Sequence, residues 1–288
     1  MLNMIGIHTV QVHLHLSDQD NYIGNRTLKS PLRYPGGKSR ALKYIVPYIP
    51  QDTDMLISPF LGGGSVEIYF ANSGIQVKAF DSFQPLVCFW KEILLNPGDL
   101  ANNIQQFYPL KKEKFDEFQA NLRDISKSLS QIDIATIFYI LNRSSFSGTT
   151  LSGGMGTSHP RFTQSSIDRV AEFKCPNLSV ECLSFEDSLK QITDNRNSIY
   201  LDPPYLLKNR KLYGNKGDAH KDFDHKLLHD TIKDKNRWVM SYNNCDQIRK
   251  IYSDFRIIDA SWSYGMNKSK KSSEILIFSN EIELEKQK

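Results

Sequence analysis

Residues 55–81 read MLISPFLGGGSVEIYFANSGIQVKAFD. A short apolar run leads into three consecutive glycines, then into a stretch of helical character and a second apolar run that ends in Asp81. Asp81 lies 17 residues after Gly64, a spacing typical of a nucleoside-binding βαβ unit, in which the acid accepts hydrogen bonds from ribose hydroxyls. Glu67 stands where a dinucleotide fingerprint has its third glycine, so a nicotinamide cofactor is disfavoured.

A second informative stretch, residues 197–205, reads NSIYLDPPY. Its apolar part predicts a buried strand, which must stop at Asp202 because Pro203 and Pro204 cannot donate to a sheet ladder. Ligands of open α/β sheets bind at this carboxyl edge. Asp202 and a proline carbonyl can accept the two hydrogens of an amino group while Tyr205 covers a planar ring. The tetrapeptide therefore indicates a nucleobase with an exocyclic amine.

The remaining pattern predicts an α/β fold interrupted by an insertion. Further strands are expected at 178–182, 199–202, 238–242, 255–259 and 275–279, with helices between several of them. A helical pattern at 39–49 is interrupted near Pro47, and another helical pattern runs from 85 to about 143. Residues 144–166 are rich in Ser, Thr and Gly, which predicts a loop or hairpin, either as a surface loop or as a segment that orders on a partner.

Composition limits the class of protein. The chain has 288 residues, 40% of them hydrophobic, and a net charge of +4. This length favours a core domain of roughly 180 to 200 residues that carries a smaller inserted one. No apolar run approaches the roughly 20 residues of a membrane span, and the first 30 residues do not resemble a secretory signal, so we expect a cytoplasmic protein. The mild positive charge is compatible with nucleic acid.

No metal site is expected. Cys88, Cys175, Cys182 and Cys245 lack paired spacing, which argues against zinc and against a disulfide framework. Residues 10–16 alternate apolar with polar side chains and predict a short strand, but the histidines on it lack a carboxylate or cysteine partner.

Taken together, the glycine loop, the acid after the second strand and the downstream D-P-P-Y resemble those of Dam-type DNA adenine-N6 methyltransferases of the alpha group. The resemblance covers most of residues 31–279. It implies a Rossmann-like S-adenosylmethionine-dependent methyltransferase sheet with an inserted, mostly helical target-recognition domain. The implied division is an N-terminal extension at 1–30, a catalytic domain at 31–84 and 175–288, and a DNA-binding insert at 85–174.

The resemblance also assigns roles to residues. The implied cofactor is S-adenosyl-L-methionine, which becomes S-adenosyl-L-homocysteine, with no metal. The residues expected to bind it are Tyr34, Lys38, Phe60, Gly62, Gly64, Asp81, Phe185 and Asp202. The residues expected to be catalytic are Asp202, Pro203, Pro204 and Tyr205. The family commonly carries Asp-Phe where this chain has Ser184-Phe185, and Glu186 or Asp187 is a candidate to replace that aspartate.

The implied substrate is adenine in double-stranded DNA, flipped out of the duplex for methyl transfer to its exocyclic amine. Basic and polar side chains of three segments are expected to contact DNA: Asn142, Arg143 and Arg161; Lys208, Arg210 and Lys211; and Lys268 and Lys270. A monomer associated with the nucleoid through DNA suffices for this chemistry. A cognate restriction endonuclease acting on the same site is left open by the sequence.

Three alternatives stay open from the residues alone. The acceptor can be adenine in RNA or the amine of cytosine in DNA, because the tetrapeptide does not exclude either. The chain can also be a DNA-binding relative that has lost catalysis, although intact Lys38, Asp81 and Asp202 argue against this.

Overall fold

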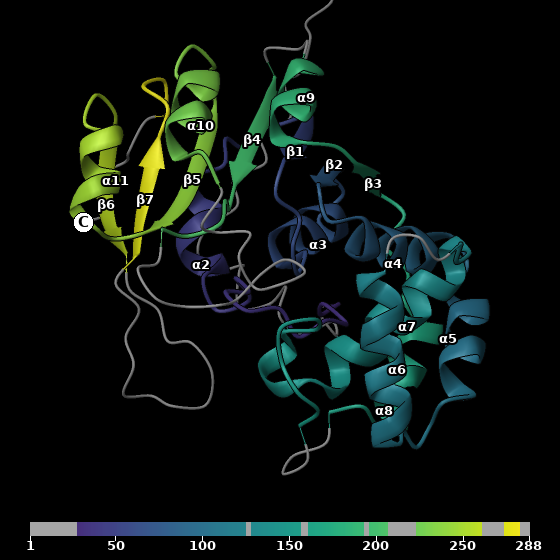
Figure 1. Ribbon diagram of the computed structural model, residues 1–288. Coiled ribbons are helices and arrows are strands. Elements are labelled where there is room, and N and C mark those ends of the chain that lie inside the picture. Colours follow the sequence, from purple (N-terminus) through teal and green to yellow (C-terminus); the bar gives the residue numbers. More distant parts are fainter. Residues whose placement is uncertain are drawn as a thin grey trace, which may run out of the picture.

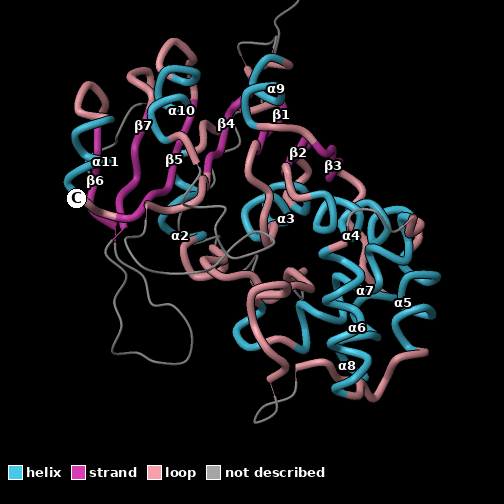
Figure 2. The backbone as a smooth tube through the Cα atoms, viewed as in Figure 1, coloured by secondary structure: helices cyan, strands magenta, loops and turns pink. Residues whose placement is uncertain are grey.

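The structure is a computed structural model that describes residues 28–124, 128–156, 161–192, 196–206, 223–260 and 274–282. The strand predicted at 10–16 lies outside these residues. Figures 1 and 2 show a sheet with helices packed against it and a group of helices beyond one of its edges. The α/β class is therefore confirmed, whereas the inserted target-recognition domain stays a prediction.

In the part of the chain that the structure describes, seven strands form one sheet, in the order β3-β2-β1-β4-β5-β7-β6. Their bounds are β1 (Met55–Ser58), β2 (Gln76–Asp81), β3 (Leu178–Cys182), β4 (Asn197–Leu201), β5 (Trp238–Asn243), β6 (Arg256–Ala260) and β7 (Glu274–Phe278). Neighbouring strands from β3 to β5 are parallel, whereas β7 runs antiparallel to both β5 and β6. The predicted strands are confirmed, with ends that differ by at most two residues.

The strand order reverses between β1 and β4. The chain moves outward from β1 through β2 to β3 and then returns to place β4 on the other side of β1. The segments that follow β1 and β4 consequently leave the sheet in different directions and open a crevice at the carboxyl ends of these strands. The glycine loop follows β1 and Asp202 follows β4, so the topology brings the two informative stretches of the sequence together.

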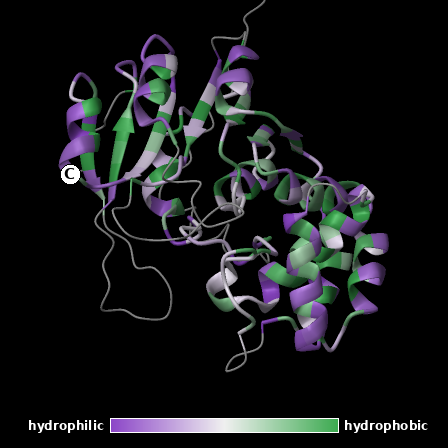
Figure 3. Ribbon diagram, viewed as in Figure 1, coloured by the Kyte–Doolittle hydropathy of each residue, from purple (hydrophilic) through white to green (hydrophobic). Residues whose placement is uncertain are grey.

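Helices cover both faces of the sheet. These helices are α2 (Leu42–Ile45), α3 (Ser65–Asn72), α9 (Phe185–Lys190), α10 (His225–Ile232) and α11 (Asp246–Ile251). Alternate strand residues face opposite sides: Leu56 and Tyr200 join a hydrophobic cluster with α2 and α3, whereas Ile57 and Leu201 join one with α9, α10 and α11. In Figure 3, β6 and β7 carry mostly the hydrophobic colour and α11 mostly the hydrophilic one, as expected for a covered sheet.

The interruption predicted at Pro47 is confirmed. Helix α2 gives way to a 3₁₀ turn, η1 (Val46–Tyr48), which contains Pro47. Proline has no N–H to continue an α-helix, and the tighter turn accommodates it.

Within the described residues, five α-helices lie between β2 and β3 in the chain. They are α4 (Gln84–Leu95), α5 (Pro97–Gln105), α6 (Lys112–Arg123), α7 (Gln131–Ser144) and α8 (Gln164–Ala171). Helix α4 packs against β2, β3 and α7, whereas α5, α6, α7 and α8 pack on one another beyond the β3 edge (Figure 1). The first helix of the insert therefore shares its core with the sheet.

The Gly-rich stretch after α7 is a packed hairpin-like loop. Ser145 and Met155 form an antiparallel bridge, and the side chain of Gln119 donates to the carbonyls of Thr150 (2.8 Å) and Gly153 (2.7 Å). Residues 145–156 of this stretch are therefore packed against α6. The loop prediction was wrong for residues 164–166, because Thr163 caps α8 and begins a helix there.

One glycine of this loop has no room for a side chain. Gly148 has φ +74°, and a Cβ at this position would lie 1.9 Å from the carbonyl oxygen of Arg33. The loop thus presses directly on the backbone of the segment that leads to the Tyr34–Lys38 turn.

We expect Gly148→Ala to lower the free energy of unfolding by roughly 1–3 kcal/mol, the typical cost of a strained backbone conformation, with a further loss from the contact with Arg33. Gly98→Ala is the matched control, because a Cβ at Gly98 meets no atom within 4 Å and alanine favours the helix. Urea unfolding followed by circular dichroism measures both. Equal stability of the two variants would contradict the packing of this loop against Arg33.

Candidate active site

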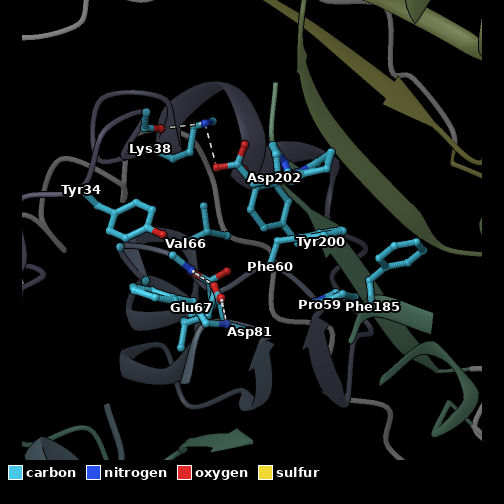
Figure 4. Close-up of a pocket in the computed structure, with 18 of the residues that line it drawn as sticks. Tyr34, Lys38, Pro59, Phe60, Val66, Glu67, Asp81, Phe185, Tyr200 and Asp202 are labelled. Atoms are coloured by element: carbon cyan, nitrogen blue, oxygen red, sulfur yellow. Dashed lines mark hydrogen bonds and ion pairs between the residues drawn. The ribbon is translucent and has the colours of Figure 1, made fainter. Parts of the chain in front are cut away.

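A pocket of about 570 Å³ lies at the carboxyl ends of β1 and β4 (Figure 4). It collects residues from the segments 34–38, 59–67, 81–83, 184–186, 200–205 and Phe223. All eight residues predicted to bind the cofactor and all four predicted to be catalytic lie along its walls. Its size is within the range of about 300–1,000 Å³ that is typical of small-molecule sites.

Asp202 is held from two sides. Its Oδ2 accepts a hydrogen bond from Lys38 Nζ at 2.8 Å, and its Oδ1 accepts one from Ser241 Oγ at 2.9 Å. Lys38 Nζ also donates to the carbonyl of Gly36 at 2.8 Å. The lysine side chain is 4% exposed and the aspartate 22%. Because a carboxylate offers about four lone-pair sites, Asp202 keeps acceptor capacity toward the pocket after these two bonds.

Tyr205 is also fixed in place. Its ring stacks on Tyr242 at 5.9 Å between centroids, and Lys38 Nζ lies 4.9 Å from its centroid. Its hydroxyl donates to Glu274 Oε2 at 2.6 Å. Just beyond, the side chain of Asn243 pairs with both the N–H and the carbonyl of Leu206, each at 3.0 Å. The D-P-P-Y turn is thus tied to β5 and β7 rather than left loose.

The glycine loop is fixed by Asp81 and by helix α4. Asp81 accepts from the N–H groups of Gly62 (3.1 Å) and Phe83 (2.9 Å), and burial raises the pKa of this carboxyl. Trp90 of α4 donates its indole N–H to the carbonyl of Gly62 at 3.1 Å. Gly64 has φ +67°, and a Cβ there would lie 2.8 Å from the Trp90 ring. Both facts require glycine at this position.

Aromatic side chains form an apolar wall opposite these polar groups. Phe60, Phe185 and Phe223 lie with their ring centroids 5.5 to 5.7 Å apart. Figure 4 shows Phe60 and Phe185 on the Pro59 side of the pocket, away from the Lys38–Asp202 pair. The pocket therefore has an apolar end suited to a planar ring and a charged end.

Comparison with known proteins assigns the family. Residues 34–266, most of the chain, match the family described as D12 class N6 adenine-specific DNA methyltransferase. The chain belongs to this family. It is therefore an adenine-specific DNA methyltransferase, and the resemblance inferred from its motifs is confirmed.

Several characterised relatives of this D12 methyltransferase align at low identity. The type II methyltransferase M.CviBI of Paramecium bursaria Chlorella virus NC1A is 23% identical over 62% of this chain and 69% of its own length. The type II methyltransferase M1.LlaDCHI of Lactococcus lactis subsp. cremoris is 23% identical over 85% of this chain and 93% of its own. The DNA adenine methylase of Haemophilus influenzae is 24% identical over 60% and 63%.

Ser184 of the D12 methyltransferase caps helix α9, where the family commonly has an aspartate. Its hydroxyl accepts from the N–H of Asp187 at 3.1 Å. Asp187 is exposed and pairs with Lys190 at 2.8 Å, and it is not among the residues along the pocket, whereas Glu186 is. Of the two candidates to replace the aspartate, the structure therefore favours Glu186.

The residues predicted to contact DNA separate into three cases. Asn142 has no exposed surface, and its side chain bonds to the backbone of Arg33 and Gly148. The DNA contact predicted for Asn142 was therefore wrong. The residue is buried and joins the Gly-rich loop to the segment that leads to the Tyr34–Lys38 turn. Arg143 donates to the carbonyl of Arg161 at 2.7 Å. The basic residues predicted on the other two segments lie outside the described residues: Lys208, Arg210, Lys211, Lys268 and Lys270.

Other residues of the site were not predicted from the sequence. Ser241 and Asn243 end β5, beside β4, and Glu274 begins β7. The rule that ligands bind at the carboxyl ends of strands, which pointed to Asp202, applies equally to β5. Ser241 and Asn243 could therefore have been predicted from the sequence. Phe223 had no comparable signal. Within the described residues, no group of three or more His, Cys, Asp or Glu side chains could hold a metal ion, and no helix is long and apolar enough to cross a membrane.

Glu67 is the least expected group of the pocket. It lies in the first turn of α3 and is 2% exposed, and its Oε1 accepts from Ser58 Oγ at 2.5 Å. Burial raises the pKa of this carboxyl to about 7, and the negative charge of Asp202 also raises it, while Ser58 and Lys38 oppose the shift. Glu67 therefore titrates near neutral pH in the folded protein.

This titration gives a pH dependence of stability. A carboxyl whose pKa is raised on folding stabilises the folded state fully below its unfolded pKa, and this contribution is lost as pH rises to about 7. Between pH 5 and 8 we expect the wild-type protein to lose roughly 2–3 kcal/mol of unfolding free energy that Glu67→Gln does not lose. Urea unfolding at several pH values measures the difference, and parallel pH profiles would refute the assignment.

Proposed function

We propose that this methyltransferase transfers a methyl group from S-adenosylmethionine to the exocyclic amine of an adenine flipped out of duplex DNA. One observation carries the proposal: the pocket is continuous from Asp81 and the glycine loop to Asp202 and Tyr205. A single cavity thus offers groups that suit a nucleoside cofactor beside groups that suit an amino-bearing base.

The residues of the pocket fit the cofactor. The half-buried carboxylate of Asp81 suits ribose hydroxyls, and the loop at Gly62 and Gly64 permits close backbone approach. The apolar wall at Phe60 and Phe185 suits the adenine ring of the cofactor. When bound, S-adenosylmethionine supplies a methyl group on a positively charged sulfur, which the amine nitrogen takes with loss of one proton.

Asp202 and the Pro203 carbonyl accept the two hydrogens of the target amine. The lone pair of this nitrogen is delocalised into the adenine ring, and acceptors on its hydrogens favour a more tetrahedral, more nucleophilic nitrogen. Lys38 and Ser241 hold the Asp202 carboxylate in one orientation. Alignment of the amine with the methyl group is then the main catalytic contribution.

Tyr205 stacks on the flipped base, and DNA contacts offset the cost of flipping, which is a few kcal/mol. Arg33, Arg143 and Arg161 form a basic cluster beside the Gly-rich loop. Burial lowers the pKa of Arg33 and of Arg143, and repulsion by Arg161 lowers both further, which reports their proximity. Arg161 is exposed and available to phosphates. The basic segments predicted at 208–221 and 268–271 lie outside the described residues, and their contact with DNA stays a prediction.

The family assignment favours adenine in DNA over adenine in RNA or the amine of cytosine. A cognate restriction endonuclease is proposed by analogy with relatives named as type II methyltransferases. A monomeric state and cytoplasmic residence stay predictions.

We expect Asp202→Ala to lower methyl transfer at least about 100-fold, because the amine loses its orienting acceptor. The purified protein is incubated with tritiated S-adenosylmethionine and either mixed-sequence duplex DNA or RNA, and the labelled nucleoside is identified. The exposed Asp234→Asn variant is the control. Label in 6-methyladenine with the wild type supports the proposal. Label in RNA alone, label in cytosine, or full activity of Asp202→Ala would reject it.

We expect Tyr205→Ala to weaken capture of the flipped base by roughly 5- to 150-fold, the equivalent of about 1–3 kcal/mol of stacking. Tyr205→Phe keeps the ring and is the control. Affinity for a duplex with a mismatched target adenine is compared with affinity for the matched duplex. The wild type and Tyr205→Phe should gain from the mismatch, Tyr205→Ala should not, and cofactor binding should change little. No gain in any of the three would count against base flipping.

A further inference from the structure

Glu67 has no role in the chemistry described so far. Its side chain lines the pocket from α3, and the hydrogen bond that it forms with another side chain among the described residues comes from Ser58 of β1. A buried carboxyl at a ligand pocket costs stability whenever it ionises. A ligand that carries a positive charge would offset this cost.

Among the residues that the structure describes, the charges around Glu67 do not supply that partner in the free protein. Lys38 is already paired with Asp202 at 2.8 Å, so this pair is neutral as a unit. Tyr200 of β4 faces the same region with its pKa raised well above the ordinary value by burial, and it stays uncharged. Asp81 of β2 and Glu186 of α9 also line the pocket, and both carboxyls can only add negative charge. With Glu67 ionised, the group formed by Lys38, Asp202 and Glu67 therefore carries one negative charge in excess.

We propose that Glu67 is the counter-ion for the positively charged sulfur of S-adenosylmethionine, protonated in the free pocket at neutral pH or below and ionised when this cofactor binds. The inference rests on the proposed function, since it takes the pocket as the cofactor site. The cofactor brings one net positive charge, which balances the excess negative charge. The product, S-adenosylhomocysteine, has lost the methyl group and that charge, so it leaves Glu67 protonated.

This assignment makes cofactor binding depend on protons in a way that product binding does not. Because Glu67 titrates at about 7, S-adenosylmethionine has to displace its proton below this pH, and each pH unit weakens binding by up to about tenfold. We expect the preference for cofactor over product to fall five- to tenfold from pH 8 to pH 6. The two ligands share their amino and carboxylate groups, so the ratio isolates the charge on sulfur.

The test is isothermal titration calorimetry of the full chain at pH 6.5 with S-adenosylmethionine and with S-adenosylhomocysteine. Each titration is run in two buffers of different ionisation enthalpy, which gives the number of protons released. We expect about 0.8 protons released per cofactor bound, as a group of pKa about 7 requires, and close to none for the product. Glu67→Gln should abolish this difference and flatten the pH profile of the affinity ratio.

Glu92→Gln is the matched control, since Glu92 is buried at 6% exposure but bonds to Asn96 and Gln131 in the helical part. It should keep the wild-type difference. Equal proton release for both ligands in the wild type, or an unchanged difference in Glu67→Gln, overturns the inference. If Glu67→Gln does not fold, the wild-type comparison decides alone. If S-adenosylmethionine does not bind at all, the proposed function fails with it, whereas binding without differential proton release rejects only the role of Glu67.

Discussion

The ion pair between Lys38 and Asp202 ties together segments 164 residues apart in the chain. A buried charge pair is tolerated only when its remaining hydrogen-bonding groups are satisfied, and here the carbonyl of Gly36 and the hydroxyl of Ser241 do this. The pair explains why the Tyr34–Lys38 turn, which precedes the first strand, lies against the end of β4. Through Tyr34 and the glycine loop, the same turn closes one side of the pocket.

The pair is asymmetric in its exposure, and this matters for chemistry. The lysine is almost completely covered, while the aspartate keeps about a fifth of its side chain exposed. The buried Lys38 therefore holds the Asp202 carboxylate in place, and this carboxylate presents its free lone pairs to the cavity. The ring of Tyr205, with Lys38 and Tyr242 near it and Glu274 on its hydroxyl, is supported in the same manner.

Strand positions and the main site followed from the sequence because both rest on local chemistry. A double proline ends a strand wherever it occurs, and a glycine loop followed by a strand and an acid is typical of a nucleoside site. These two patterns placed Asp202 and Asp81 in the predicted site, and both line the pocket. Asn142 was misjudged because its burial depends on Arg33 and Gly148, one of which is 109 residues away. In the sequence, Glu67 stood out only because it replaces the third glycine of a dinucleotide fingerprint. Its partner, Ser58, lies on the preceding strand, and a pairing of this kind emerges only when the βα unit is folded.

Helix α4 belongs to two parts of the molecule at once. Its residues pack on β2, β3 and α7, and Trp90 reaches the carbonyl of Gly62 while its ring fills the space that a side chain on Gly64 would need. The indole of Trp90 thus belongs to the helical insert and also contacts the glycine loop. Substitutions confined to α5, α6 and α8 leave this contact in place, whereas any change that moves α4 also moves the indole that supports the glycine loop. The helical part of the chain is therefore free to diverge only as far as the position of Trp90 is kept.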